Sequence, residues 1–162
     1  MNFNKTFTLP FQFQIPTFVD EFLSKKILIK ARLKYFKRYF YIYLKGEHLY
    51  EISTILPQHK NILWINISAP SLGDSLMDLS SRIMLEDKNV DLFTDFGNAH
   101  LYEKDLFFSS IYTDPNKLKN SFYDLIIVDS FSSRSIRSKY NVARSTPYVS
   151  MFGYFNGPEV NR

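Results

Sequence analysis

The chain has 162 residues, of which 45% are hydrophobic and 17% aromatic, and its formal net charge is +4. This length suits one domain with a sizeable core. The chain has no cysteine, which excludes disulfides, thiolate catalysis and cysteine-ligated metals, and its three histidines are too scattered for a zinc site. No apolar run approaches the ~18 residues that span a bilayer, and the N-terminus does not resemble a signal peptide. We therefore expect a cytoplasmic protein that uses no metal and no cofactor.

The positive charge is concentrated in one segment. Residues 22–46 carry eight Lys or Arg residues and no acidic residue, which leaves 12 basic against 16 acidic residues elsewhere. A single basic segment in an otherwise acidic chain indicates a local, anionic partner.

The same segment has the pattern of an amphipathic helix, which we predict over residues 21–44. One apolar stripe consists of Ile29, Leu33, Phe36, Phe40, Tyr43 and Leu44. Lys45 and four further cations lie beside the stripe, and these four are predicted to bind membrane: Lys30, Lys34, Lys37 and Arg38. A basic, aromatic-rich helix of this kind (residues 22–45) suits the surface of an anionic membrane, so we expect the protein at the inner face of the cytoplasmic membrane.

Two alternatives to membrane binding remain open for this helix. It is also compatible with an ordinary surface helix whose apolar stripe packs on the domain and whose lysines are solvated. Lysine interleaved with tyrosine also suits nucleic acid, but no RNP, KH or helix-turn-helix signature accompanies it, so we expect no nucleic-acid partner.

The chain divides near residue 60 into an N-terminal extension (1–60) and an α/β domain (61–162). Gly46 is predicted to end the basic helix. Residues 62–67 form a short apolar run typical of a buried strand, which Pro70 interrupts. From residue 72 the apolar residues follow a helical period, and the predicted inward stripe is Leu72, Leu76, Leu79 and Ile83.

Further β-α units follow in the second half of the chain. The residue pattern predicts strands at 89–94, 107–112, 123–129 and 147–155, turns at 95–98 and 113–116, and helices at 99–106 and 131–140. The apolar strand at 123–129 is typical of a parallel strand covered on both faces. We therefore predict a Rossmann-like open parallel sheet. Because no helix follows the last predicted strand, we expect the domain to continue beyond Arg162.

The junction at Gly73-Asp74 lies where ligands bind in such sheets, after a strand and at the start of a helix. Glycine allows close approach of backbone to a ligand, and aspartate is a candidate general base. On spacing alone, the pattern favours Asp74 as the N-cap of the following helix over a general base.

These residues resemble a known family, the lipopolysaccharide heptosyltransferases of glycosyltransferase family 9. The family's hallmark is an apolar strand followed by a Ser-Leu-Gly-Asp loop, as in Ser71-Leu72-Gly73-Asp74. Residues 90–94 (VDLFT) and 123–129 (YDLIIVD) resemble two further strands of the family, and Arg134-Ser135 follows the second of them. The resemblance covers residues 61–162. Asn66 stands where many members have arginine, Ala69-Pro70 lengthens the loop, and a glycine expected after residue 129 is missing.

The resemblance implies the N-terminal half of a GT-B glycosyltransferase, which inverts the sugar configuration without metal. It assigns Asp74 as the general base, and Ser71 and Gly73 as substrate-binding residues. Arg134 and Arg137, with Lys139 and Arg144 nearby, are candidates to bind the anionic groups of a glycolipid or oligosaccharide acceptor. The nucleotide-sugar donor would bind a C-terminal domain that this chain lacks, so the chain alone is expected to be inactive. Asp95 and Asp129, isolated at strand ends, make a poor magnesium site. The alternative is a non-catalytic, membrane-tethered α/β binding module in which Asp74 only caps a helix.

Overall fold

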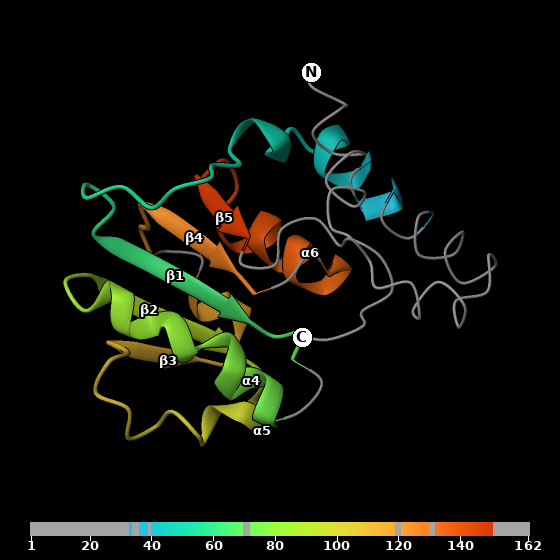
Figure 1. Cartoon of the computed structure of the whole chain (residues 1–162). Coiled ribbons are helices and arrows are strands. Elements are labelled where there is room, and N and C mark those ends of the chain that lie inside the picture. Colours follow the sequence, from blue (N-terminus) through green and yellow to red (C-terminus); the bar gives the residue numbers. More distant parts are fainter. Residues whose placement is uncertain are drawn as a thin grey trace, which may run out of the picture.

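The computed structural model describes residues 33, 36–38, 40–69, 72–118, 121–129 and 132–150, and at 74, 77 and 78 it describes the backbone alone. Within these residues the chain forms one five-stranded sheet with helices around it (Figure 1).

All pairs of neighbouring strands in the sheet are parallel, and the strand order is β3-β2-β1-β4-β5. The strands are β1 (Asn61–Asn66), β2 (Asn89–Thr94), β3 (Ser110–Tyr112), β4 (Leu125–Val128) and β5 (Tyr148–Ser150). The central strand β1 pairs with β2 from Asn61 onward and with β4 from Ile62 onward. The predicted α/β open parallel sheet is thus confirmed at this level.

The central strands β1 and β4 are buried along nearly their whole length because both faces of the sheet are covered there. Ile62 and Trp64 of β1 belong to a core cluster with Leu79 and Tyr102, whereas Leu63 and its neighbours face a second cluster. Successive side chains of a strand point to opposite faces, so the two clusters lie on opposite sides of the sheet. The second cluster contains Ala143, at the end of the longest described helix.

The helices are short. The α-helices with described bounds are α4 (Leu72–Asp78), α5 (Phe96–Ala99) and α6 (Ser133–Val142), and the 3-10 helices are η1 (Glu47–Leu49), η2 (Ser80–Leu85) and η3 (Pro115–Leu118). Of these, α6 packs on β1 and β4. Side chains of η2 and of the segment after α5 enter the first core cluster.

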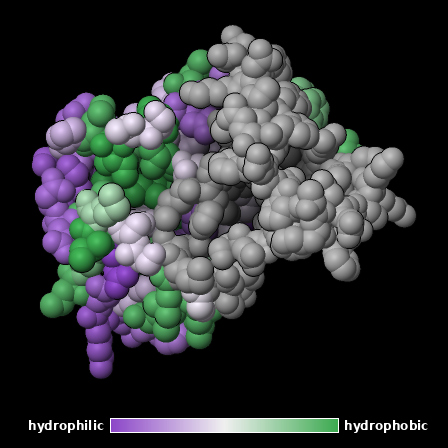
Figure 2. All heavy atoms as spheres, viewed as in Figure 1, coloured by the Kyte–Doolittle hydropathy of each residue, from purple (hydrophilic) through white to green (hydrophobic). Residues whose placement is uncertain are grey.

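The predicted leucine stripe after β1 is wrong in part. Leu79 is fully buried, but Leu72, Leu76 and Ile83 are exposed. The helix ends at Asp78, and the chain continues as the tighter η2, which rotates the later side chains away from the expected face. Ser75 faces the sheet instead, where its hydroxyl donates to the Asn66 side chain at 2.7 Å. Figure 2 shows the resulting hydrophobic groups gathered over α4 and α5.

The prediction of a turn at 95–98 and a helix at 99–106 is also wrong. The helix comes first, as α5, with Asp95 as its extended N-cap residue, and residues 100–104 form turns. Tyr102 and Phe108 pack edge to face in the core at 5.7 Å between ring centroids, which fixes this segment by packing rather than by helix propensity.

The other predicted elements of the domain are confirmed with shifted ends. Residues 110–112, 125–128 and 133–142 form β3, β4 and α6 within or beside the predicted ranges, and η3 begins within the predicted turn. Of the predicted last strand, Tyr148–Ser150 is β5, and 151–155 lie outside the described residues.

The basic helix is described only near its predicted C-terminal end. Residues 33, 36–38 and 40–44 are helical, and the remainder of 21–44 lies outside the described residues. Gly46 ends this helix in the left-handed conformation at φ 71°, as a C-terminal glycine does. The chain beyond it joins the domain, because the backbone at residues 50–52 pairs with Tyr148 of β5.

Candidate functional site

The candidate site lies at the carboxyl end of the sheet, between β1 and β4. The chain runs outward from β1 to β2 and β3, then returns to place β4 on the other side of β1. In open α/β sheets, the crevice at such a reversal is the usual ligand site because the loops after the two strands diverge there. Here the loop after β1 leads to α4 and the loop after β4 leads to α6.

A buried carboxylate joins the two loops. Asp129 is fully buried directly after β4, and its Oδ2 accepts hydrogen bonds from the backbone N–H groups of Ile67 (2.9 Å) and Ser68 (2.8 Å). Its Oδ1 accepts the hydroxyl of Ser135, in the first turn of α6, at 2.6 Å. Through these hydrogen bonds, Asp129 holds the ends of β1 and β4 and the start of α6 in fixed positions relative to one another.

Three serine hydroxyls continue this network toward solvent. Ser68 Oγ lies 2.6 Å from Ser135 Oγ and also hydrogen-bonds Ser132 Oγ. Ser132 is the N-cap of α6, and its hydroxyl accepts the backbone N–H of Ser135 at 3.0 Å. Ser68 and Ser132 are only half-buried, so a polar ligand can reach their hydroxyls.

A second buried polar cluster holds α4 against β1. Besides its bond to Asn66, Ser75 Oγ lies 2.8 Å from the hydroxyl of Tyr102, and all three side chains are buried. Buried polar groups are tolerated when they are hydrogen-bonded to one another. Because Ser75 anchors α4, the backbone of the preceding Gly73-Asp74 is placed at the same edge of the sheet as Ser68.

The carboxyl end of β2 contributes to the same edge. Asp95, which follows β2, forms an ion pair with Arg134 of α6. In the sheet, β2 and β4 are the two neighbours of β1. The ion pair therefore connects the segments that follow these two strands, across the end of β1. Thr94 is buried, and its Oγ1 has no hydrogen-bond partner in the described part of the chain.

The structure places the residues predicted from the resemblance as follows. Gly73 and Asp74 are the second and third residues of α4, and Gly73 is exposed. Asp74 is thus inside the first turn rather than at the cap position, and Ser71 lies outside the described residues. Arg134 is at the site. Arg137 is directed elsewhere, over the ring of Tyr41 at 6.0 Å from the ring centroid.

The cations predicted to bind membrane are only partly described. Lys37 is exposed and Arg38 is half-buried, whereas Lys30 and Lys34 lie outside the described residues.

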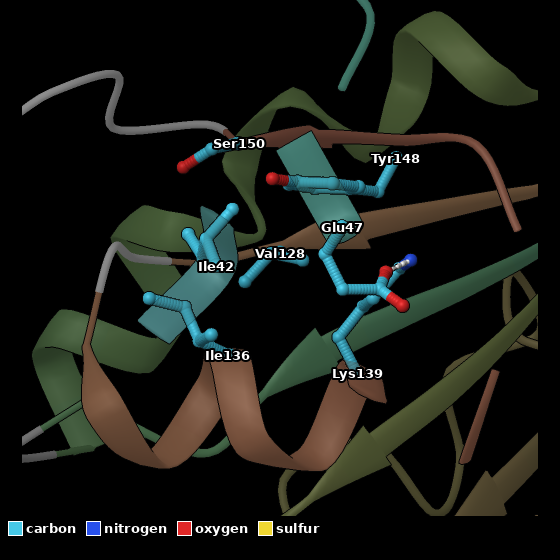
Figure 3. A pocket seen from close by; sticks show the side chains of 7 residues that line it. All are labelled: Ile42, Glu47, Val128, Ile136, Lys139, Tyr148 and Ser150. Carbon is cyan, nitrogen blue, oxygen red and sulfur yellow. Dashed lines mark hydrogen bonds and ion pairs between the residues drawn. The ribbon is translucent and has the colours of Figure 1, made fainter. Parts of the chain in front are cut away.

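Lys139 is not available to a substrate. Its ammonium group is buried in an ion pair with Glu47 and lies 4.7 Å from the centroid of the Tyr148 ring (Figure 3). Burial lowers the pKa of Lys139, and the carboxylate of Glu47 opposes that shift. The pair borders a small cavity of about 10 Å³, which is otherwise lined largely by apolar residues such as Ile42 and Val128.

Tyr123, just before β4, has a phenol with a raised pKa. Burial and a 2.8 Å hydrogen bond to Asp91 raise the pKa of this phenol well above its usual range. Both effects keep Tyr123 neutral, and the side chain packs in the second core cluster. It serves the fold, at the opposite end of β4 from the site.

The sequence pattern did not predict the serine network around Asp129. Two signals for it were present, an acid that ends an apolar strand and a run of serines after it in place of glycine. Neither indicates that Ser68, more than sixty residues away, completes the cluster.

Comparison of the chain with protein-family models, with curated proteins and with solved structures found no match. Among the described residues, no group of three or more His, Asp or Glu side chains is placed to hold a metal ion. In that same part of the chain, no helix is long and apolar enough to cross a membrane.

Proposed function

We propose that this chain is the acceptor-binding domain of an inverting, heptosyltransferase-like glycosyltransferase, with Asp74 as the general base. One observation carries the proposal. The backbone of Gly73-Asp74, in the first turn of α4, shares the carboxyl edge of the sheet with Ser68, Ser132 and Arg134. The strand order 3-2-1-4-5 fits a Rossmann-like domain, whose ligands bind at this edge.

The reaction needs one base and one acceptor position. An acceptor hydroxyl oxygen attacks the anomeric carbon of the donor while the bond to the nucleotide diphosphate breaks, and the diphosphate leaves with the electron pair. The proton of the hydroxyl passes to the carboxylate of Asp74, which must come within hydrogen-bond reach. Attack from the face opposite the leaving group inverts the configuration.

The polar edge offers the acceptor two kinds of contact. The half-buried hydroxyls of Ser68 and Ser132 can exchange hydrogen bonds with sugar hydroxyl groups. The exposed guanidinium of Arg134, held by Asp95, can bind a phosphate or carboxylate of a lipopolysaccharide or surface glycan. We assign no binding site for the nucleotide-sugar to this chain, because its sequence contains neither a GxGxxG nor a P-loop GK[ST] motif.

The second candidate is a non-catalytic α/β binding module. The position of Asp74 in the first turn of α4 favours this module, because an acid at that position stabilises a helix through the helix dipole and needs no catalytic role. Both candidates share the ligand edge and differ in the role of Asp74.

Titration of the chain with chemically defined ligands, followed by amide NMR, tests the proposal. Phosphorylated core oligosaccharides of lipopolysaccharide should shift amide signals near Ser68, Gly73 and Ser132 saturably, and ADP- or UDP-sugars should not. Arg134→Ala should weaken oligosaccharide binding by roughly 10-fold or more, as expected for loss of a charge-assisted hydrogen bond.

Lys60→Ala is the matched control, because Lys60 is also an exposed cation paired with an aspartate, Asp87, but precedes β1. It should bind oligosaccharide like the parent. Saturable binding of a nucleotide-sugar at the end of β1, or no response to any oligosaccharide, would contradict the acceptor-domain assignment.

A further inference from the structure

The described part of the basic helix has one buried side and one exposed side. Ile42 is buried and, as Figure 3 shows, lies beside Val128 and Ile136 at the cavity. The opposite side exposes five large apolar residues, namely Leu33, Phe36, Phe40, Tyr43 and Leu44. On a helix of 3.6 residues per turn they occupy an arc of roughly 100° that faces away from Ile42. The five described members of the predicted stripe thus share one side of the helix and are exposed, and Ile29 lies outside the described residues.

Three aromatic residues of the exposed stripe make ring contacts, one within the stripe and one with a neighbouring residue. The rings of Phe36 and Phe40 stack with centroids 6.2 Å apart, and Tyr43 packs against His48 at 4.6 Å. Single exposed apolar residues need no explanation, but a contiguous aromatic stripe beside a charged rim marks an interaction surface.

Several cations gather around the rings of Tyr41 and Tyr140, on the side of the helix that lies between the stripe and Ile42. Tyr41 of the helix meets Tyr140 of α6 edge to face at 6.4 Å between centroids. Lys45 lies 5.1 Å from the Tyr140 ring, Arg144 lies 5.3 Å from it, and Arg137 lies over Tyr41. Lys37 adds a further exposed cation from the helix.

These four cations have no acidic counterpart in the described part of the fold. Among the described residues, Lys37, Lys45, Arg137 and Arg144 form no ion pair, whereas Arg134 on the same helix α6 is paired with Asp95. Within the described residues, no carboxylate therefore neutralises their positive charge.

We propose that the five apolar residues and these four cations form one docking face for an anionic lipid bilayer. Apolar side chains of a membrane-surface helix enter the boundary between headgroups and acyl chains, while the neighbouring cations bind lipid phosphates. A bilayer satisfies the uncompensated positive charge and the aromatic stripe together, so we favour it over a protein partner. The face is composite, because α6 of the folded domain and the residues just after it supply half of its cations. This assigns Arg137 to the membrane rather than to the sugar acceptor.

Co-sedimentation of the whole chain with vesicles tests this proposal independently of sugar binding. Vesicles of phosphatidylcholine with phosphatidylglycerol should retain the protein in a salt-sensitive manner, and pure phosphatidylcholine should not. Each cation near an anionic surface contributes about five-fold in binding, so Arg137→Gln/Arg144→Gln should weaken retention by roughly 25-fold. Phe36→Ser/Phe40→Ser should abolish it.

Matched controls use the same residue types elsewhere on the surface. Lys60→Gln/Lys104→Gln removes two exposed cations, and Phe96→Ser/Leu106→Ser removes two exposed apolar residues, so both variants should bind like the parent. Thermal melting checks that every variant folds.

Three results would overturn the proposal. They are equal retention by neutral and anionic vesicles, no retention by either, and parental retention of Arg137→Gln/Arg144→Gln. If sedimentation velocity shows that Phe36→Ser/Phe40→Ser converts a dimer to a monomer while no vesicle binds, the stripe is a self-association interface instead.

Discussion

At the level of single residues, Asp129 explains how the candidate site keeps its shape. Within the described part of the chain, its two carboxylate oxygens accept two hydrogen bonds from the backbone after β1 and one from Ser135 of α6. A buried carboxylate costs desolvation energy and is tolerated only when it is fully hydrogen-bonded. The site thus depends on an acid that need not itself contact a ligand.

We expect Asp129→Ala to destabilise the protein by about 3–5 kcal/mol, because three donors lose a charged acceptor and two of them are buried. Asp129→Asn keeps one acceptor oxygen and should lose about 2 kcal/mol. Urea unfolding followed by circular dichroism measures both. The control Asp87→Asn removes an exposed acid and should leave the free energy of unfolding unchanged within error. An Asp129→Ala protein as stable as the parent would show that the network does not hold the edge together.

At the level of elements, α6 connects the three parts of the molecule. Its N-terminal turn contributes to the candidate site, and its inner face packs on the sheet. Lys139 connects α6 to η1 through the ion pair with Glu47. Glu47 Oε1 also accepts the backbone N–H of Ser145 at 3.3 Å. The chain after the basic helix is therefore anchored by a buried charge pair and not by apolar contact alone.

We expect Glu47→Gln to cost about 3–5 kcal/mol at neutral pH, since it leaves Lys139 charged, buried and unpaired. Removing the carboxylate that raises the pKa of Lys139 leaves only the burial that lowers it. The folded variant then binds fewer protons than the unfolded chain, so its stability should rise with pH up to about 10.4, more steeply than that of the parent. Urea unfolding across this pH range measures the effect.

The double variant Glu47→Gln/Lys139→Met supplies the control for this pair. It removes the unpaired charge, so it should recover most of the lost stability and show little dependence on pH in this range. A Glu47→Gln protein whose stability falls as pH rises would contradict the assigned direction of the Lys139 pKa shift.

At the level of the whole molecule, the proposed ligand edge and the proposed membrane face use different residues. The edge lies past the ends of β1 and β4, whereas the exposed stripe belongs to the helix whose buried side chain, Ile42, meets Val128 and Ile136 (Figures 1 and 3). Different residues of α6 serve the two regions, Ser135 and Arg134 at the edge and Arg137 at the docking face. The two proposals can therefore be tested and can fail separately.

In a protein that joins this chain to a donor-binding domain, we expect Asp74→Asn to slow sugar transfer by ~10²–10⁴-fold, because the amide cannot accept the proton. Folding should change by no more than about 1 kcal/mol, the contribution of one acid in the first turn of a helix. Transfer rates and thermal melting of the same preparation distinguish the two roles of Asp74. Asp87→Asn, before β2, should leave transfer unchanged. Parental transfer by Asp74→Asn would exclude Asp74 as the base.

The sequence by itself determined the strands of this protein and the class of its sheet. The predicted strand at 89–94 matches β2 residue for residue, and the apolar runs at 62–67 and 123–129 contain or overlap β1 and β4. The runs at 62–67 and 123–129 can be predicted because a strand buried on both faces is largely apolar along its length, which is a local property. Gly46 is a similar case, since a left-handed residue after a helix favours glycine locally.

Only the tertiary structure decided which side chains each element turns inward. Ser75 is buried in place of Leu72 and Leu76 because Asn66 and Tyr102 offer it hydrogen bonds. The aromatic stripe of the basic helix stays exposed because Ile42 occupies the contact with α6. The Asp129 network and the Glu47–Lys139 pair join residues about sixty and ninety positions apart. The chemistry of a polar side chain shows that it needs a hydrogen-bond partner when it is buried. Which residue serves as that partner depends on which strands and helices the fold brings together.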